Sequence, residues 1–212
     1  MGRIEIEDAW KEEFKRRGIL WIRGKNSKGP HALLTSGYHS DGYFDATEIV
    51  SDPVELEKVC RHLIKFYCFE KDRIGKESWV FGSAFGACNL SYEFARQLGC
   101  RAGFTEPDIN GNMVLKRFFI KPRATIILVE DVVTTGGTIA QTRDCLERAG
   151  GNTFSRVMAI DNRSGKNFFD NLAIMALVNE PMYLWKPEEC PLCKQGSIAL
   201  RYKENREQFK IE

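Results

Sequence analysis

An unbroken apolar run, rich in β-branched residues, occupies positions 125–129 and ends in two adjacent carboxylates, Glu130 and Asp131. Hydroxyl residues and glycines follow at 134–138, and apolar residues at helical spacing begin at Ile139. Continuous apolar runs are typical of strands buried on both faces, whereas apolar residues recurring every three or four positions indicate a helix. The stretch therefore predicts a buried strand, a tight loop and the start of a helix.

Similar apolar patterns alternate through the middle of the chain. We expect helices at 5–17, from Asp52 onward, at 87–98 and at 139–149, and strands at 79–81, 100–105, 154–160 and 172–178. Alternating strands and helices between residues 52 and 178 predict an α/β domain with a mainly parallel sheet. The segment 31–45 is rich in turn formers and aromatic residues, which predicts strands of a small subdomain beside that sheet.

Composition restricts the classes of protein to consider. The chain has 212 residues, 43% of them hydrophobic and 28% charged, with a formal net charge of +2. These values fit one globular domain and give no general case for a nucleic-acid or membrane partner. No apolar run approaches the length of a membrane span, and the N-terminus lacks the apolar core of a signal peptide, so we expect a cytoplasmic protein. The odd number of cysteines, seven, favours reduced core thiols over a disulfide framework.

The loop after the central run suits a particular kind of ligand. Gly136 and Gly137 allow close approach of backbone N–H groups, and the helix start adds partial positive charge, so this loop can bind a phosphate. Glu130 and Asp131 repel phosphate and should instead face sugar hydroxyls or a hard cation such as Mg²⁺. A ligand with a phosphate at one end and hydroxyls in the middle satisfies both. The alternative is that the acids have no ligand and the glycines serve only the turn.

The motif VEDVVTTGGT at 129–138 resembles the ribose-phosphate loop of the type I phosphoribosyltransferases. The resemblance implies that Glu130 and Asp131 are the catalytic pair that holds the ribose hydroxyls of phosphoribosyl pyrophosphate. It also implies that the following residues bind the 5′-phosphate, with Thr134 contacting substrate as well. These residues are Val132, Val133, Thr134, Thr135, Gly136, Gly137 and Thr138. The implied fold is a mainly parallel sheet flanked by helices, with a small hood subdomain.

A second loop, after the strand at 79–81, matches the family's pyrophosphate loop less closely. Its expected ligand contacts are Ser83, Ala84, Phe85 and Gly86. Small residues between a strand and a helix can present backbone amides to an anion. Ser83 replaces the usual proline and Ala87 the last glycine.

Three further segments supply candidate substrate contacts. Tyr43 and Phe44 fall on the aromatic pair of the hood in orotate phosphoribosyltransferases, although adjacent aromatics are more often packing residues. Thr35 stands where that branch usually has lysine. Arg163 is the candidate for the arginine that reaches the base carboxylate, but Asn162 is inserted before it, and a solvated loop arginine is the equal alternative.

The turn-rich loop 106–112 lacks the cations that a mobile loop supplies in well-studied orotate enzymes. A second branch of that family reads roughly F-x-E-R…G-x-M-x-L-R-R-G-F, and residues 104–117 follow it. Pro107 occupies a usually basic position. The resemblance makes Lys116 and Arg117 substrate-binding candidates.

The tail contains Cys190-x-x-Cys193, which could form half of a tetrahedral zinc site or a redox pair. There is no second CxxC, and the three histidines lie far away in the sequence, so we favour a structural turn and expect no metal-ligating residues. The same C-P-L-C-x-x-G tail occurs in the second orotate-type branch.

Taken together, the resemblance predicts one phosphoribosyltransferase domain, with an N-terminal helix and hood at 1–50, an α/β core at 51–178, and a tail at 179–212 that contributes to the hood. It implies an enzyme that transfers phosphoribose to orotate, with Mg²⁺ bound mainly through phosphoribosyl pyrophosphate, and a homodimer. Departures at Thr35, Ser83, Ala87 and Pro107 leave open a non-catalytic nucleotide-binding paralogue. A different acceptor base is the other alternative.

Overall fold

The computed structural model describes residues 2–68 and 71–209, which form two compact units. One unit comprises residues 46–180, and the other combines residues 2–45 with the tail from Pro181. Within the described ranges, no helix has both the length and the apolar character needed to cross a membrane. Within the described ranges, all seven cysteines are free thiols.

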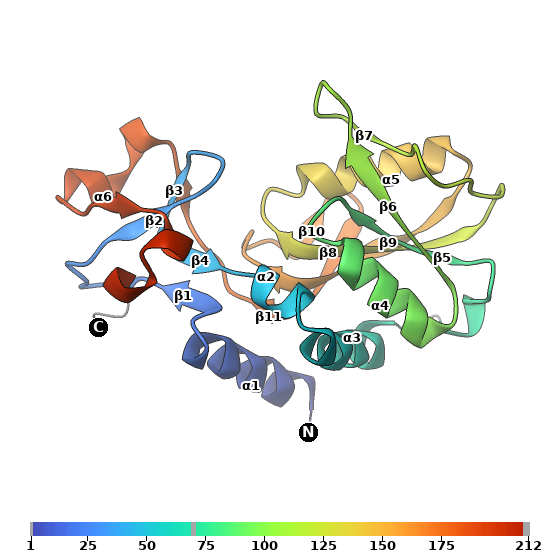
Figure 1. The fold of residues 1–212 in the computed structure, drawn as a ribbon, viewed down its shortest axis with the longest axis horizontal. Coiled ribbons are helices and arrows are strands. Elements are labelled where there is room, and N and C mark those ends of the chain that lie inside the picture. The colour runs from blue at the N-terminus through green and yellow to red at the C-terminus, as the bar shows by residue number, and fades with distance from the viewer. Residues whose placement is uncertain (1, 69–70, 210–212) are drawn as a thin grey trace. The chain divides into compact units, whose positions relative to one another are not determined.

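Seven strands form the sheet of the larger unit, in the order β10-β11-β9-β8-β5-β6-β7 (Figure 1). The five inner strands run parallel, and the short edge strands β7 and β10 are antiparallel to their neighbours. The prediction of a mainly parallel α/β sheet is therefore confirmed. The strands are β5 (Trp79–Ser83), β6 (Arg101–Pro107), β7 (Met113–Val114), β8 (Thr125–Val133), β9 (Asn152–Asn162), β10 (Phe168–Phe169) and β11 (Leu172–Asn179).

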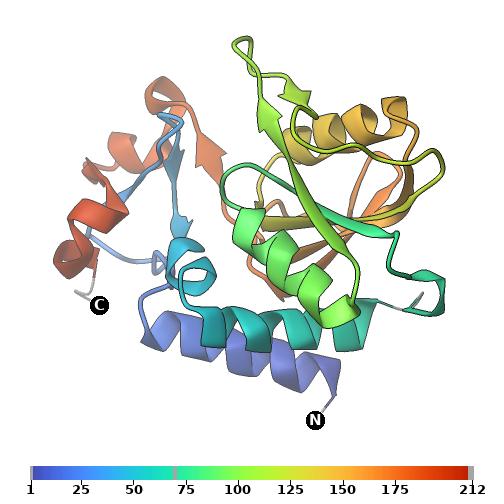
Figure 2. The same cartoon turned by 45° about the vertical axis from the view of Figure 1, so that its right-hand side comes forward.

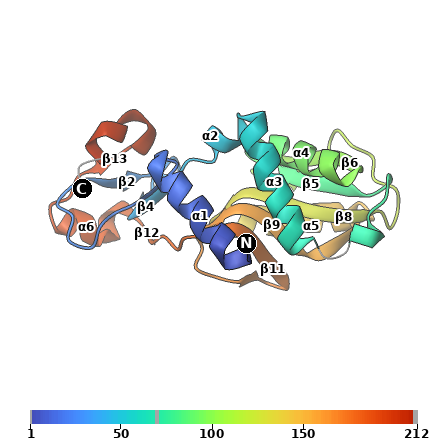
Figure 3. The same cartoon turned by 90° about the horizontal axis from the view of Figure 1, so that it is seen from below.

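The helices of this unit cover both faces of the sheet. They are α2 (Thr47–Val50), α3 (Pro53–Tyr67), α4 (Cys88–Leu98) and α5 (Gly137–Arg148), with a 3₁₀ turn at Lys71–Arg73. The chain leaves β5 through α4 to β6 on one side, and leaves β8 through α5 to β9 on the other. Because parallel crossovers are right-handed, these two helices must lie on opposite faces, as Figures 1 and 3 show.

Helix α3 begins as its sequence predicts. The Asp52 carboxylate accepts hydrogen bonds from the N–H groups of Val54 (2.9 Å) and Glu55 (3.3 Å), and Pro53 occupies the first turn. Such a cap satisfies donors that have no partner within the helix and is worth about 1 kcal/mol.

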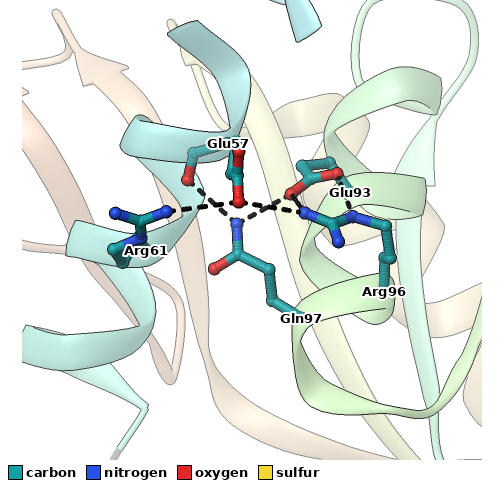
Figure 4. A network of polar contacts seen from close by, with 5 residues as sticks. All are labelled: Glu57, Arg61, Glu93, Arg96 and Gln97. Atoms are coloured by element: carbon teal, nitrogen blue, oxygen red, sulfur yellow. Dashed lines mark hydrogen bonds and ion pairs between the residues drawn. The ribbon is translucent and has the colours of Figure 1, made fainter. Parts of the chain in front are cut away.

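A polar network joins α3 to α4, which lie side by side (Figures 2 and 4). Arg61 and Arg96 both approach Glu57 Oε1, at 3.2 and 3.3 Å. Gln97 Nε2 donates to the Glu57 carbonyl (2.9 Å) and to Glu93 Oε1 (2.8 Å). Exposed ion pairs contribute at most about 1 kcal/mol each, so the network orients the two helices more than it stabilises them.

The core between the sheet and its helices is apolar. Strand β8 contributes Ile126 and Leu128, and α5 contributes Ile139 and Leu146, all buried in one cluster. Burying each such side chain contributes about 1.5–3 kcal/mol. This packing holds the carboxyl end of β8 in place.

The carboxyl ends of β5 and β8 form the point where the strand order reverses. These neighbouring strands send their chains in opposite directions, to β6 and to β9. Loops that diverge in this way leave a crevice above the sheet, which is where ligands bind in open α/β folds. The two loops that the sequence selected, 83–86 and 131–138, both start here.

The smaller unit combines the N-terminal segment with the tail. Its sheets have the orders β1-β4 and β12-β3-β2-β13, so strands occur within 31–45 as predicted. Its strands are β1 (Leu20–Ile22), β2 (His31–Leu33), β3 (His39–Ser40), β4 (Gly42–Phe44), β12 (Leu184–Trp185) and β13 (Ala199–Leu200). Its helices are α1 (Arg3–Arg16) and α6 (Pro191–Lys194), with 3₁₀ turns at Pro187–Glu189, Tyr202–Glu204 and Arg206–Phe209.

Aromatic packing and two ion pairs to a buried carboxylate hold this unit together. The Phe14 ring of α1 packs edge-on against Phe44, with centroids 5.4 Å apart. Asp45 is buried and accepts from Lys203 Nζ (2.8 Å) and Arg206 Nη2 (2.7 Å). The tail is therefore bonded directly to the N-terminal segment.

Candidate active site

The two acids at the end of β8 occupy different environments. Successive side chains of a strand point to opposite faces of the sheet. The Glu130 side chain is buried, with 8% of the residue exposed, whereas Asp131 is half-buried. They therefore differ in what they can contact.

Glu130 is bonded to the neighbouring strand. The Ser83 hydroxyl, at the end of β5, lies 2.8 Å from Glu130 Oε1 and 2.6 Å from Oε2. Burial raises the pKa of Glu130 well above its ordinary value, and the charge of Asp131 raises that pKa further. The neutral form of this carboxyl is therefore favoured.

Asp131 lies against the loop that follows β5. Its Oδ1 accepts a hydrogen bond from its neighbour, the Val132 N–H (2.9 Å). A Cβ added at Gly86 would overlap the Asp131 carboxylate. The loop can approach this acid because position 86 has no side chain.

The segment after β8 has the features of a phosphate loop. The side chains of Thr134, Thr135 and Thr138 are exposed. Gly136 has φ of +79°, a left-handed conformation that favours glycine, and α5 begins at the next residue. No side chain in the described part of the chain caps this helix, so N–H groups of its first turn can bind an anion.

The loop after β5 is anchored at one end and exposed at the other. The Ala84 N–H donates to the Thr105 carbonyl (2.7 Å), and the Ala84–Phe85 peptide bond is cis. Phe85 and Gly86 are both exposed. Residues 83–86 thus lie beside the acids of β8.

A third loop joins them after β9. The Arg163 N–H donates to the Val133 carbonyl (3.1 Å), which places residue 163 next to the end of β8. Only 7% of Arg163 is exposed, so the alternative of a solvated loop arginine is wrong. The inserted Asn162 bonds through its side chain to Ser164, Lys166 and Asn179, which secures this loop.

The expected substrate cations Lys116 and Arg117 lie near a hairpin formed by β6 and β7. Arg117 Nε is 2.7 Å from Glu106 Oε2, and Lys116 Nζ is 3.5 Å from Oε1. The hydrogen bond from Arg117 lowers the pKa of Glu106, so this carboxylate stays charged. Any anion that binds these cations must compete with it.

The aromatic pair belongs to the smaller unit. Phe44 is 5% exposed and packs on Phe14, which favours the packing interpretation for that ring. Tyr43 is half-buried and stacks on Tyr202, with centroids 4.8 Å apart. Both tyrosines line a pocket of about 240 Å³ that Thr35 also lines.

Two contacts at the site were not apparent from the sequence. One is the pairing of Ser83 with Glu130, which lie 47 positions apart. The other is Phe169 of β10, whose ring lies where a Cβ at Gly136 would be. The only local signal for the second was the aromatic pair Phe168-Phe169, which has no periodicity.

Comparisons with known proteins were made by family model, sequence and structure. No protein-family model matches the chain. It is 36% identical over 172 residues to the orotate phosphoribosyltransferase of Heliobacterium modesticaldum, covering 81% of this chain and 87% of the relative. It is also 36% identical over 204 residues to that of Desulforamulus reducens, covering 95% and 96%.

Solved structures agree on the fold. The orotate phosphoribosyltransferase of Aeropyrum pernix superposes with a TM-score of 0.62 at 21% identity, covering 79% of this chain and 92% of that one. That of Mycobacterium tuberculosis gives 0.57 at 15% identity, covering 84% and 95%. The type I phosphoribosyltransferase fold expected from the sequence is therefore confirmed, and the identity to the curated relatives shows that the chain belongs to the orotate phosphoribosyltransferase family.

Proposed function

We propose that this protein transfers the phosphoribosyl group of phosphoribosyl pyrophosphate to orotate, giving orotidine 5′-monophosphate and pyrophosphate in pyrimidine biosynthesis. The two curated relatives at 36% identity are named orotate phosphoribosyltransferase. The observation that carries the proposal is the meeting of an acid-bearing strand end and a Thr/Gly loop at the point where the strand order reverses.

The sugar phosphate would span this strand end. Residues 134–138 would bind the 5′-phosphate through exposed hydroxyls and the uncapped start of α5. Asp131 would accept hydrogen bonds from the ribose hydroxyls, which are donors. The backbone of residues 83–86 would face the pyrophosphate, because Gly86 lies against Asp131.

The acids would stabilise a transition state with positive charge on the ribose ring. Such a reaction needs positioning and charge stabilisation rather than a protein nucleophile. We assign the stabilisation of the positive charge on the ribose mainly to Asp131, which is half-buried. We assign to Glu130 the role of holding the end of β8 through its contact with Ser83. Glu130 would act on the ribose indirectly, by fixing the strand end that carries Asp131.

A magnesium ion fits this donor set. The Asp131 carboxylate and the nearby threonine hydroxyls are oxygen ligands, which Mg²⁺ prefers. The ion would be held mainly by the substrate, with Asp131 as the protein residue beside it. When bound, it would neutralise charge on the departing pyrophosphate.

For the base, we assign the orotate carboxylate to Arg163, whose guanidinium can bind a carboxylate bidentately. We keep Tyr43 as a base-side candidate. We omit Phe44, since its ring is packed on Phe14. Lys116 and Arg117 would contact pyrophosphate once Glu106 releases them.

We further propose that the smaller unit, residues 2–45 with 181–209, serves as the hood over the base, and that the protein acts as a cytoplasmic homodimer. The hood follows from the resemblance of residues 31–45 to the hood segment of orotate phosphoribosyltransferases. The dimer follows from the resemblance, and sedimentation of the full chain would test it.

The assay that tests the function uses a panel of bases. The full chain is incubated with Mg²⁺, phosphoribosyl pyrophosphate and either orotate, uracil, adenine or hypoxanthine, and pyrophosphate release is measured. Release that depends on orotate is the expected result. If pyrophosphate is released with one of the other bases and not with orotate, that base is the acceptor and the proposal of orotate is wrong.

A non-catalytic paralogue would give a different outcome. The pairing of Glu106 with both Lys116 and Arg117 favours that alternative, because it occupies the cations near the hairpin. Calorimetric binding of phosphoribosyl pyrophosphate without release for any base would replace the proposed enzyme with a sensor.

A further inference from the structure

Four metal-ligating side chains of the smaller unit converge on one point. His31, His39, Cys190 and Cys193 each offer one ligand atom, and all four atoms lie within 4.8 Å of one another. His31 and Cys190 are fully buried, His39 is buried, and Cys193 is exposed. Two imidazoles and two thiols, with three of the four side chains buried, are the donor set of a Cys₂His₂ zinc site.

The distances between the ligand atoms match a tetrahedron. His31 Nε2 and His39 Nδ1 are 3.0 Å apart. The sulfurs of Cys190 and Cys193 each lie 3.5 Å from His31 Nε2, and the Cys193 sulfur lies 3.4 Å from His39 Nδ1. Zn–N bonds of about 2.0 Å and Zn–S bonds of about 2.3 Å at tetrahedral angles set nitrogens about 3.3 Å apart and N···S pairs about 3.6 Å apart. The atoms are therefore placed as if around a common centre.

The surroundings of His31 direct its Nε2 lone pair toward that centre. The Ser197 hydroxyl donates to the Gly29 carbonyl (2.9 Å), so its oxygen is left to accept from His31 Nδ1 (2.9 Å). A proton on Nδ1 leaves Nε2 as the acceptor atom. Hydrogen bonding of the second ring nitrogen is the usual support for a metal-bound histidine.

The positions of the four residues explain what a metal would do. His31 and His39 lie on the paired strands β2 and β3, Cys190 directly precedes the short helix α6, and Cys193 lies within it. A metal here would link the N-terminal hairpin to the tail 159 positions away. Four protein ligands leave no open coordination position, which characterises structural rather than catalytic zinc.

We propose that His31, His39, Cys190 and Cys193 bind one structural Zn²⁺ ion that joins the two chain segments of the smaller unit. The site is independent of the proposed transferase activity, because none of its ligands belongs to residues 83–86 or 130–138. Interpreting Cys190-x-x-Cys193 as a turn alone misses the site. The segment does form a helical turn, and the fold adds the two histidines that the sequence places far away.

The test measures metal in the purified full chain. Protein produced with added zinc is passed through metal-free buffer and analysed by elemental mass spectrometry. We expect about one zinc per chain. The variants Cys193→Ser and His39→Ala should lower the zinc content at least about tenfold, whereas the control variants Cys100→Ser and His62→Gln should retain it.

A second measurement uses the wild-type chain and does not depend on the variants folding. Zinc is removed and Co²⁺ is titrated in, and absorption is recorded. A tetrahedral site with two thiolates should give visible d–d bands and a thiolate charge-transfer band that saturate at about one Co²⁺ per chain. The proposal is overturned if wild-type protein holds no zinc and shows no such bands, if the ligand variants keep as much zinc as the controls, or if Cys190 and Cys193 are found as a metal-free disulfide.

Discussion

At the scale of single residues, the two neighbouring carboxylates at the end of β8 differ in burial and in the groups they contact. Glu130 is buried and accepts hydrogen bonds from Ser83, whereas Asp131 is half-buried beside Gly86. Sequence motifs treat the two as an equivalent pair. The structure makes Asp131 the more accessible of the two acids.

The variant Asp131→Asn tests this assignment. It keeps the shape of the side chain and removes its charge, so we expect kcat/KM for orotate to fall at least about 100-fold. The free energy of unfolding should change by less than about 0.5 kcal/mol, as for other partly exposed substitutions. A steady-state turnover close to that of wild type would show that the charge of Asp131 does not contribute to catalysis.

The raised pKa of Glu130 predicts a pH dependence of stability. A group with a raised native pKa contributes its full stability below its unfolded pKa, which is about 4.3 for glutamate, and loses it as pH rises through the native pKa. Glu130→Gln cannot titrate. Between about pH 5 and pH 8, the free energy of unfolding should therefore fall less in this variant than in wild type.

Denaturant titrations across that pH range would measure the difference. The exposed Glu188→Gln is the matched control, and its stability should follow wild type throughout. Parallel curves for Glu130→Gln and wild type would show that burial does not shift the titration of Glu130.

At the scale of elements, the site depends on how closely two loops approach. The loop after β5 reaches the end of β8 because Gly86 has no Cβ to overlap Asp131. The parallel pairing of β5 with β8 then places Ser83 beside Glu130. Neither contact is local in the sequence.

Gly86→Ala should disturb this approach. The added methyl displaces the Asp131 carboxylate or the loop, so KM for phosphoribosyl pyrophosphate should rise about tenfold, a change of about 1.4 kcal/mol. Gly75→Ala is the control, because a Cβ there meets nothing within 4 Å. Equal kinetic constants for the two variants would mean that the loop accommodates the methyl group at position 86 without displacing Asp131, which would contradict the prediction.

At the scale of the whole molecule, the chain builds two units that are interleaved in sequence. The unit formed by residues 46–180 interrupts the other, whose segments 2–45 and 181–209 are separated in sequence by the whole of the first unit. Closing so long a connection costs conformational entropy. Asp45 with its two cationic partners, and the proposed zinc site, both join these segments.

Removal of the metal should therefore loosen one unit selectively. With a chelator present, amide hydrogen exchange should speed up in residues 31–40 and 184–200, because their common link is lost. Exchange in β8, in the other unit, should stay unchanged. Uniform acceleration across both units, or none in 31–40, would contradict this prediction when followed by mass spectrometry on the full chain.

The sequence alone determined the mainly parallel α/β core and the strand-loop-helix junction at 125–149, because hydrophobic period, helix caps and glycine placement are encoded within short windows. The acid pair and Thr/Gly loop at 130–138 were identified for the same reason. Only the tertiary structure decided that Arg163 is buried, that Phe44 packs on Phe14, and that two distant histidines meet two cysteines. Those outcomes depend on strand pairing and long-range packing. These bring together residues that are far apart in the sequence, and no local sequence pattern shows that such residues are in contact.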